Sequence, residues 1–133
     1  MVTWSTCAEE DSGMRDPAKL RVLAQAEDLA IEAYSVSAAF PASERFGLTA
    51  EIRRAAVSVG SNIVEGSQRQ GNRAFIVFLH QALGSAAEMQ FQLRVAIRLK
   101  FGDVDAIRRL IDLANQVQRM IARLIVVLRQ KGD

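Results

Sequence analysis

The sequence has little of what would cross-link a chain or anchor it in a membrane. Its 133 residues include one cysteine, Cys7, which excludes an intrachain disulfide framework and favours a cytoplasmic location. No apolar run approaches the roughly 18 residues that a membrane-spanning helix needs, so no membrane partner is expected. Residues 1–14 are acidic and lack a basic segment followed by an apolar one, so they do not resemble a signal peptide.

Residues that commonly perform catalysis or hold metals are also scarce. The single histidine, His80, has valine rather than glutamate three positions before it, which does not fit the Glu-x-x-His pattern of di-iron bundles. The segment "GSNIVEG" has no preceding strand and no Lys-Ser/Thr pair, so it is not a phosphate loop. Glu65 and Glu88 could each be a general base, but neither has an identifiable acid or nucleophile. We therefore expect no enzyme, no metal site and no cofactor.

What the chain does contain is helix-forming material, rich in alanine, leucine, arginine and glutamine, with only two prolines. We predict a flexible tail over residues 1–16, in which Met14 is an alternative start, and a single domain over residues 17–133. Helices are expected at about 17–39, 49–65, 72–100 and 103–130. Pro17 suits a first helical turn, while Thr49, Asn72 and Asp103 are candidate N-caps. Gly66 is expected just beyond the end of the second helix.

Each predicted helix carries an apolar stripe at three- and four-residue steps. Because the connections are short, consecutive helices should be antiparallel, which predicts an all-α, antiparallel up-down four-helix bundle. The stripes comprise Leu23, Ala26, Ala30, Ala33, Tyr34 and Ser37; Leu48, Ile52, Ala55, Ala56, Val59 and Ile63; Phe75, Leu79, Ala82, Ala86, Met89, Leu93 and Ile97; and Ile107, Leu110, Ala114, Val117, Ile121, Leu124 and Leu128.

The third helix has a second apolar row on its opposite side, formed by Val77, Gly84, Phe91 and Val95. A helix that is apolar on two sides needs two partners, and in a small chain the second partner is expected to be another copy. The alternative is that the N-terminal tail covers Phe91 and Val95.

Arginines supply most of the positive charge in a chain of net charge +2 and pI near 9.1. Clustered arginines can bind the phosphates of RNA or DNA, but they can equally form salt bridges within or between subunits. Both interpretations stay open for Arg53, Arg54, Arg69 and Arg73 around the second helix, and for Arg108, Arg119 and Arg123 on the fourth.

A polar row lies on the outer face of the second helix, next to small residues that let helices approach closely. We interpret this row as a hydrogen-bond network that fixes packing or assembly, in preference to a ligand site. Its members are Arg54, Ser58, Ser61, Asn62 and Glu65, with Glu88 of the third helix.

Two long motifs, "FPASERFGLTAEIRRAAVSVGSNIVEGSQR" and "FIVFLHQALGSAAEMQFQL", carry a family resemblance over about residues 20–128. The chain resembles the bacterial four-helix-bundle family encoded in intervening sequences of large-subunit ribosomal RNA genes. It departs from the family pattern at Glu51, Gly60 and Val64, where glutamine, proline and alanine are frequent. Glu51 weakens a phosphate site beside the arginines, and Gly60 should leave its helix less kinked.

The resemblance implies a homopentamer of four-helix bundles. The family is similar to accessory proteins of diversity-generating retroelements, which are pentameric and basic and bind nucleic acid and a reverse transcriptase. The function expected is therefore a non-enzymatic, self-assembling bundle that binds RNA or DNA, with a protein partner as a further possibility. The alternative is a protein–protein scaffold that binds no nucleic acid.

Overall fold

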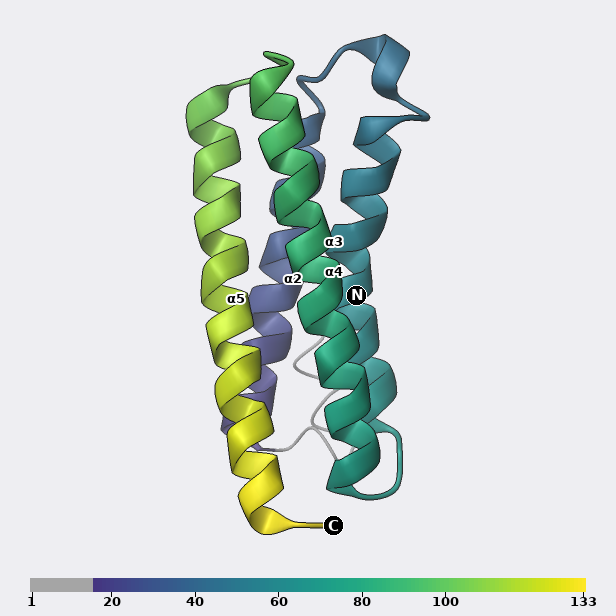
Figure 1. Ribbon diagram of the computed structural model, residues 1–133, viewed down its shortest axis with the longest axis vertical. Coiled ribbons are helices and arrows are strands. Elements are labelled where there is room, and N and C mark those ends of the chain that lie inside the picture. Colours follow the sequence, from purple (N-terminus) through teal and green to yellow (C-terminus); the bar gives the residue numbers. More distant parts are fainter. Residues whose placement is uncertain (1–15) are drawn as a thin grey trace, which may run out of the picture.

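The computed structural model describes residues 16–133, which form four helices that run alternately up and down (Figure 1). The predicted tail lies outside these residues except for Asp16. The helices are α2 (Pro17–Ser37), α3 (Leu48–Ser67), α4 (Asn72–Arg98) and α5 (Val104–Lys131), and a short 3-10 helix η2 (Ala42–Glu44) lies between α2 and α3. The described chain is thus all-α, as the sequence predicts.

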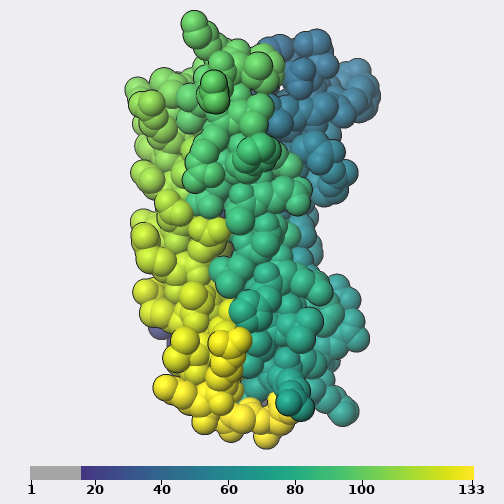
Figure 2. All heavy atoms as spheres, in the orientation of Figure 1, coloured from purple at the N-terminus to yellow at the C-terminus, as the bar shows by residue number. Residues whose placement is uncertain are grey.

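The helices pack as a four-sided bundle in which α2 contacts α3 and α5, and α4 contacts the same two helices. The side chains of α4 and α5 meet along most of the bundle's length (Figure 2). All seven residues of the predicted α5 stripe are buried, from Ile107 to Leu128. On α2 the stripe is less accurate, because Tyr34 is half exposed and Leu29 is fully buried instead.

Two of the predicted helix starts are confirmed. Pro17 occupies the first turn of α2, where Asp16 Oδ1 accepts a hydrogen bond from the backbone N–H of Ala18 at 2.8 Å. Asp103 caps α5 by accepting hydrogen bonds from the N–H groups of Asp105 and Ala106. In both cases a carboxylate satisfies backbone donors that have no partner within the helix.

The predicted caps at Thr49 and Asn72 are wrong, because carboxylates from elsewhere take their place. Thr49 is buried inside the first turn of α3, and the N–H of Leu48 donates to Glu44 Oε1 at 3.1 Å. Asn72 instead donates its side-chain amide to the carbonyl of Gly132, while Asp133 Oδ1 accepts from the N–H of Arg73.

Three predicted helix ends also differ, and the first of them is that of α2, which stops at Ser37 rather than near residue 39. The third predicted helix stops at Arg98 rather than Lys100, because Lys100 takes a left-handed backbone conformation with φ of 61°. Gly66 does not terminate α3 but lies within it.

Gly66 instead lies where α3 and α4 leave no room for a side chain. A Cβ at this position would lie 2.7 Å from Cβ of Phe78 and 2.8 Å from Cδ1 of Phe75. Real Cβ atoms are not found that close to a neighbouring backbone-proximal carbon, so a side chain here would push the two helices apart.

Replacing Gly66 by alanine is therefore expected to lower the free energy of unfolding by about 1–3 kcal/mol through overpacking. Gly60→Ala in the same helix is a matched control, because its added Cβ would lie 3.6 Å from that of Ala26, an ordinary contact. The better helix propensity of alanine should raise stability there by up to about 1 kcal/mol. Urea denaturation measures both variants, and equal stabilities would contradict the close approach.

Candidate nucleic-acid interface

The arginines of α3 are largely committed to partners within the chain. Arg53 donates from Nε to Ser37 Oγ at 2.8 Å, and its guanidinium lies 4.6 Å from the centre of the Tyr34 ring. A guanidinium placed in this way joins α3 to α2 by a hydrogen bond and a cation–π contact. Arg53 therefore holds α3 against α2 and is engaged within the chain.

Arg54 forms an ion pair with Glu51, one turn earlier on α3. The hydrogen bond to Glu51 raises the pKa of Arg54 above its usual value, and the negative charges of Glu51 and Glu88 add to the effect. Both side chains of the pair are exposed, so the pair contributes little to stability. It does place a carboxylate where a phosphate would otherwise bind Arg54.

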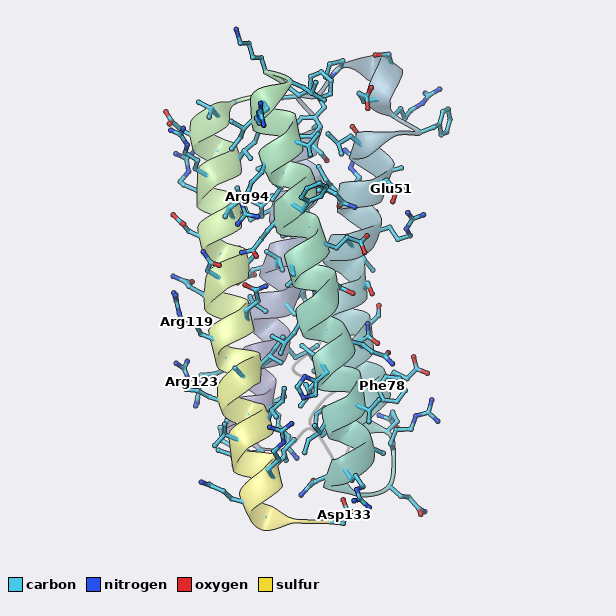
Figure 3. All side chains as sticks on the ribbon, viewed as in Figure 1. Glu51, Phe78, Arg94, Arg119, Arg123 and Asp133 are labelled. Atoms are coloured by element: carbon cyan, nitrogen blue, oxygen red, sulfur yellow. The ribbon has the colours of Figure 1, made fainter. Side chains whose placement is uncertain are left out.

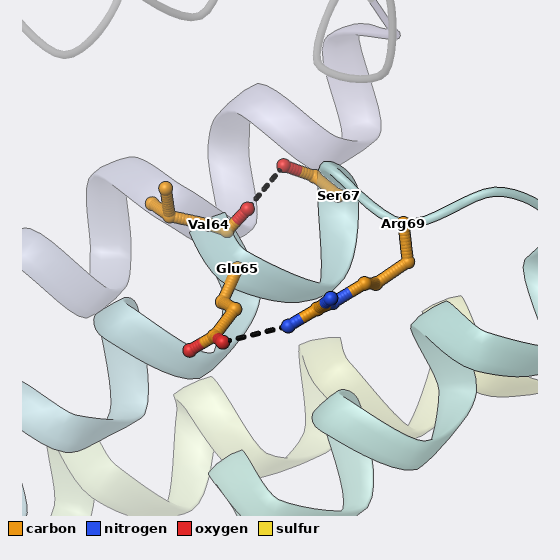
Figure 4. A network of polar contacts seen from close by, with 4 residues as sticks. All are labelled: Val64, Glu65, Ser67 and Arg69. Atoms are coloured by element: carbon orange, nitrogen blue, oxygen red, sulfur yellow. Dashed lines mark hydrogen bonds and ion pairs between the residues drawn. The ribbon is translucent and has the colours of Figure 1, made fainter.

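Arg69 lies just beyond α3 and pairs back onto it. Its NH2 group lies 2.8 Å from Glu65 Oε1 (Figure 4) and its guanidinium lies 5.0 Å from the centre of the Phe78 ring. In the same turn, Ser67 Oγ donates to the carbonyl of Val64 at 2.6 Å. Arg73 lies in the first turn of α4, and its exposed side chain makes no ion pair among residues 16–133.

The arginines of α5 differ, because neither Arg119 nor Arg123 forms an ion pair with any residue of the part that the structure describes. Both extend from the outer side of α5 (Figure 3) and line a groove of about 390 Å³ between α2 and α5. A third arginine, Arg21 of α2, lines the same groove, and no carboxylate does. Arg108 lies about 16 Å further along α5 and does not belong to this group.

Charge changes sign along the α2/α5 face. Beyond Arg123, towards the end of α5, a neighbouring cavity of about 150 Å³ is lined by Lys19 and Lys131 and by one acidic residue, Asp16; Arg21 and Arg123 line it as well. In the other direction the groove shares Gln25 and Gln116 with a hollow of about 650 Å³, whose charged lining is Asp28, Glu32 and Arg109. The basic section therefore extends from Lys131 to Arg119, about 18 Å along the helix.

Sequence reasoning missed Arg21, because its grouping with the α5 arginines depends on α2 and α5 being neighbours. Arg21 lies one turn before Gln25 on the same face of α2. A sequence analysis that had paired this face with α5 would have placed Arg21 beside the α5 arginines. The seven arginines singled out from the sequence do not form one surface. The structure brings together Arg119 and Arg123, and it places the α3 arginines on the opposite side of the bundle.

The predicted polar network is present in part, at the seam between α3 and α4. Asn62 Nδ2 donates to the carbonyl and the hydroxyl of Ser58, at 2.9 and 3.1 Å, and the Ser58 hydroxyl lies 2.9 Å from that of Ser85. Ser85 was not among the predicted members. Ser61 faces α2 instead, where it lines an apolar groove.

The remaining predicted members do not join this network. Arg54 and Glu65 belong to the separate ion pairs described above, and Glu88 Oε1 accepts from Gln92 Nε2 at 3.2 Å. The buried side-chain amide of Gln90 links α4 to α5, because it donates to Asn115 Oδ1 at 2.7 Å and to the carbonyl of Ile111.

Within residues 16–133 no three His, Cys, Asp or Glu side chains are grouped so that they could hold a metal ion. Of the helices described, none is long and apolar enough to cross a membrane.

The model of the 23S rRNA-intervening sequence protein family matches residues 18–123, most of the bundle. The chain belongs to this family. Among solved structures, it is similar to a protein of unknown function from the S23 ribosomal protein family of Bacteroides thetaiotaomicron VPI-5482. The TM-score is 0.70 at 22% identity, over 78% of this chain and 97% of the other, a likeness that shows the fold alone. No curated protein matches the chain.

The predicted polar residues are divided between a hydrogen-bond network and separate surface ion pairs, and this division predicts different effects on stability. Asn62→Ala removes both donations to Ser58 in a half-buried seam and should lower the free energy of unfolding by about 1 kcal/mol. Glu65→Ala breaks only an exposed i,i+4 pair and should cost no more than about 0.5 kcal/mol. Ser61→Ala is the control within the same helix. Urea denaturation that ranks Glu65→Ala above Asn62→Ala in its effect would contradict this division.

Proposed function

We propose that this protein is a non-catalytic nucleic-acid-binding bundle that holds backbone phosphates of RNA or DNA in the basic groove between α2 and α5. The observation that carries the proposal is the group formed by Arg21, Arg119 and Arg123, three guanidinium groups in one groove without a carboxylate. Arginine is suited to phosphate because its planar fork donates two parallel hydrogen bonds.

The contrast with α3 supports this choice of face. Arg54 and Arg69 already have carboxylate partners, so a phosphate would have to displace Glu51 or Glu65. In the α2/α5 groove a phosphate would displace only water and counterions, and release of counterions from the nucleic acid favours binding.

The groove recognises the backbone rather than bases. Its lining offers arginine together with two glutamines, Gln25 and Gln116, and no aromatic side chain on which an unpaired base could stack. The basic section spans about 18 Å, or roughly five steps of 3.4 Å along one strand. We therefore expect few phosphate contacts for each copy and little dependence on sequence.

The proposal predicts salt-dependent binding that depends on the groove. Fluorescence anisotropy of labelled structured RNA and of duplex DNA, titrated at several salt concentrations, should give a log–log slope of about two to three for each copy engaged. The triple variant Arg21→Gln, Arg119→Gln, Arg123→Gln should lose most of the affinity and most of the slope.

A second triple variant, Arg54→Gln, Arg69→Gln, Arg73→Gln, removes the same number of charges from the other side of the bundle and should bind almost normally. Equal losses in both triple variants would show that only net charge matters. Absence of binding by the unmodified protein at low salt would overturn the proposal in favour of a protein–protein scaffold, and partners would then be sought after nuclease treatment.

A further inference from the structure

The basic groove between α2 and α5 adjoins a second hollow at the end of the bundle. Arg21 and Arg123 line both the groove and the cavity of about 150 Å³ that follows it, and Arg123 extends from the outer side of α5 (Figure 3). Beyond these two arginines the cavity is lined by Lys19 in the first turn of α2 and by Lys131 in the last turn of α5. We call this hollow the end cavity.

The end cavity concentrates positive charge. Four cations line it and none of them forms an ion pair with a described residue. The Lys19 ammonium lies 5.5 Å from the centre of the Phe75 ring, a contact that leaves its charge in place. The one acidic residue, Asp16, is the N-cap of α2, where its Oδ1 accepts from the N–H of Ala18 at 2.8 Å.

Four positive groups against one carboxylate leave an excess of three positive charges, the same excess as in the groove, whose volume is about 390 Å³. The end cavity therefore holds this excess in less than half the space. The floor beneath these charges is apolar and includes Val22, Leu124 and Leu128. An apolar floor keeps water from one side of the cavity, which strengthens the attraction between its cations and an anion.

A phosphate at the end of a strand offers more to such a cavity than a phosphate within the strand. An internal phosphodiester carries one negative charge, whereas a terminal phosphate monoester carries about 1.5 to 2 negative charges at pH 7 and three strong acceptor oxygens. Arginine and lysine bind such oxygens through charge-assisted hydrogen bonds. The dense positive charge at the end of the groove therefore suits a terminal monoester.

We propose that the end cavity binds the terminal phosphate monoester of the RNA or DNA strand whose internal phosphates lie in the basic groove. This inference rests on the proposed function and adds a substrate class to it, namely strands that end in a phosphate. Lys19 and Lys131 bind the terminal group, and Arg21 and Arg123 hold it together with the next phosphate. Arg119 lines the groove but not the end cavity, so it holds internal phosphates only.

A free phosphate monoester, such as a nucleoside monophosphate, offers the same terminal group. The two sources differ in affinity, because a strand already held in the groove presents its end to the cavity at high effective concentration. A phosphorylated strand should therefore bind more tightly than either a nucleoside monophosphate or the same strand without its terminal phosphate.

Isothermal titration calorimetry at low salt tests the proposal without a label on either end of the strand. Single-stranded oligonucleotides of one sequence, matched in length to the basic section, carry hydroxyl groups at both ends, a 5′ phosphate or a 3′ phosphate. At least one phosphorylated form should bind about tenfold more tightly than the hydroxyl form. Its log–log salt slope should be larger by up to about 0.7, because it carries up to one additional charge.

Four single variants distinguish the end cavity from an effect of net charge. Lys131→Gln should remove most of the preference for the phosphorylated strand, while Arg119→Gln should weaken all strands by a similar factor and keep the preference. Asp16→Asn retains an N-cap, because asparagine caps as well as aspartate, and should increase the preference. Lys100→Gln is the matched control at the opposite end of the bundle and should leave the preference unchanged. Circular dichroism checks that each variant is folded.

Equal binding of the hydroxyl form and both phosphorylated forms overturns this inference and leaves the proposed groove in place. A preference that neither Lys131→Gln nor Asp16→Asn changes puts the terminal phosphate elsewhere and also overturns it. A nucleoside monophosphate that binds as tightly as the phosphorylated strand overturns the assignment to strand ends. Absence of binding by every strand at low salt overturns the proposed function and this inference together.

Discussion

The close approach of α3 to α4 is the constraint on which the arrangement of the other surfaces depends. It requires a residue without a side chain at Gly66, where Phe75 and Phe78 of α4 leave no room for a Cβ. Further along the same seam the two helices meet through small polar residues, and the hydroxyls of Ser58 and Ser85 lie 2.9 Å apart. The larger polar side chains of α3 lie outside this seam, where Arg54 pairs with Glu51 and Arg53 contacts α2.

Arginines of similar exposure therefore differ in whether they already have a partner within the chain. A guanidinium that already has a carboxylate or a ring beside it, as Arg69 does with Glu65 and Phe78, gains little from a phosphate. Arg119 and Arg123 form no ion pair with any of the described residues. The number of arginines is therefore a weaker guide to an anion-binding face than the positions of the nearest carboxylates.

The same distinction between local and distant information explains what could be predicted from the sequence. The stripes of α3, α4 and α5 and the cap at Asp103 follow from spacing within one helix, and the structure confirms them. The caps proposed at Thr49 and Asn72 were wrong because Glu44 and Asp133 provide carboxylates from other segments, which no local pattern shows. Arg21 was missed for the same reason, since it becomes part of a groove only when α2 lies beside α5.

The two outward faces of α2 differ in chemistry, because each lies beside a different helix. Its residues Ala26 and Ala30 face the α3 side, whereas Arg21 and Gln25 face α5. One groove with three arginines would hold only a few phosphates and would bind weakly at physiological salt. The affinity of such a groove would fall steeply as salt rises, because each phosphate that it holds releases counterions from the nucleic acid.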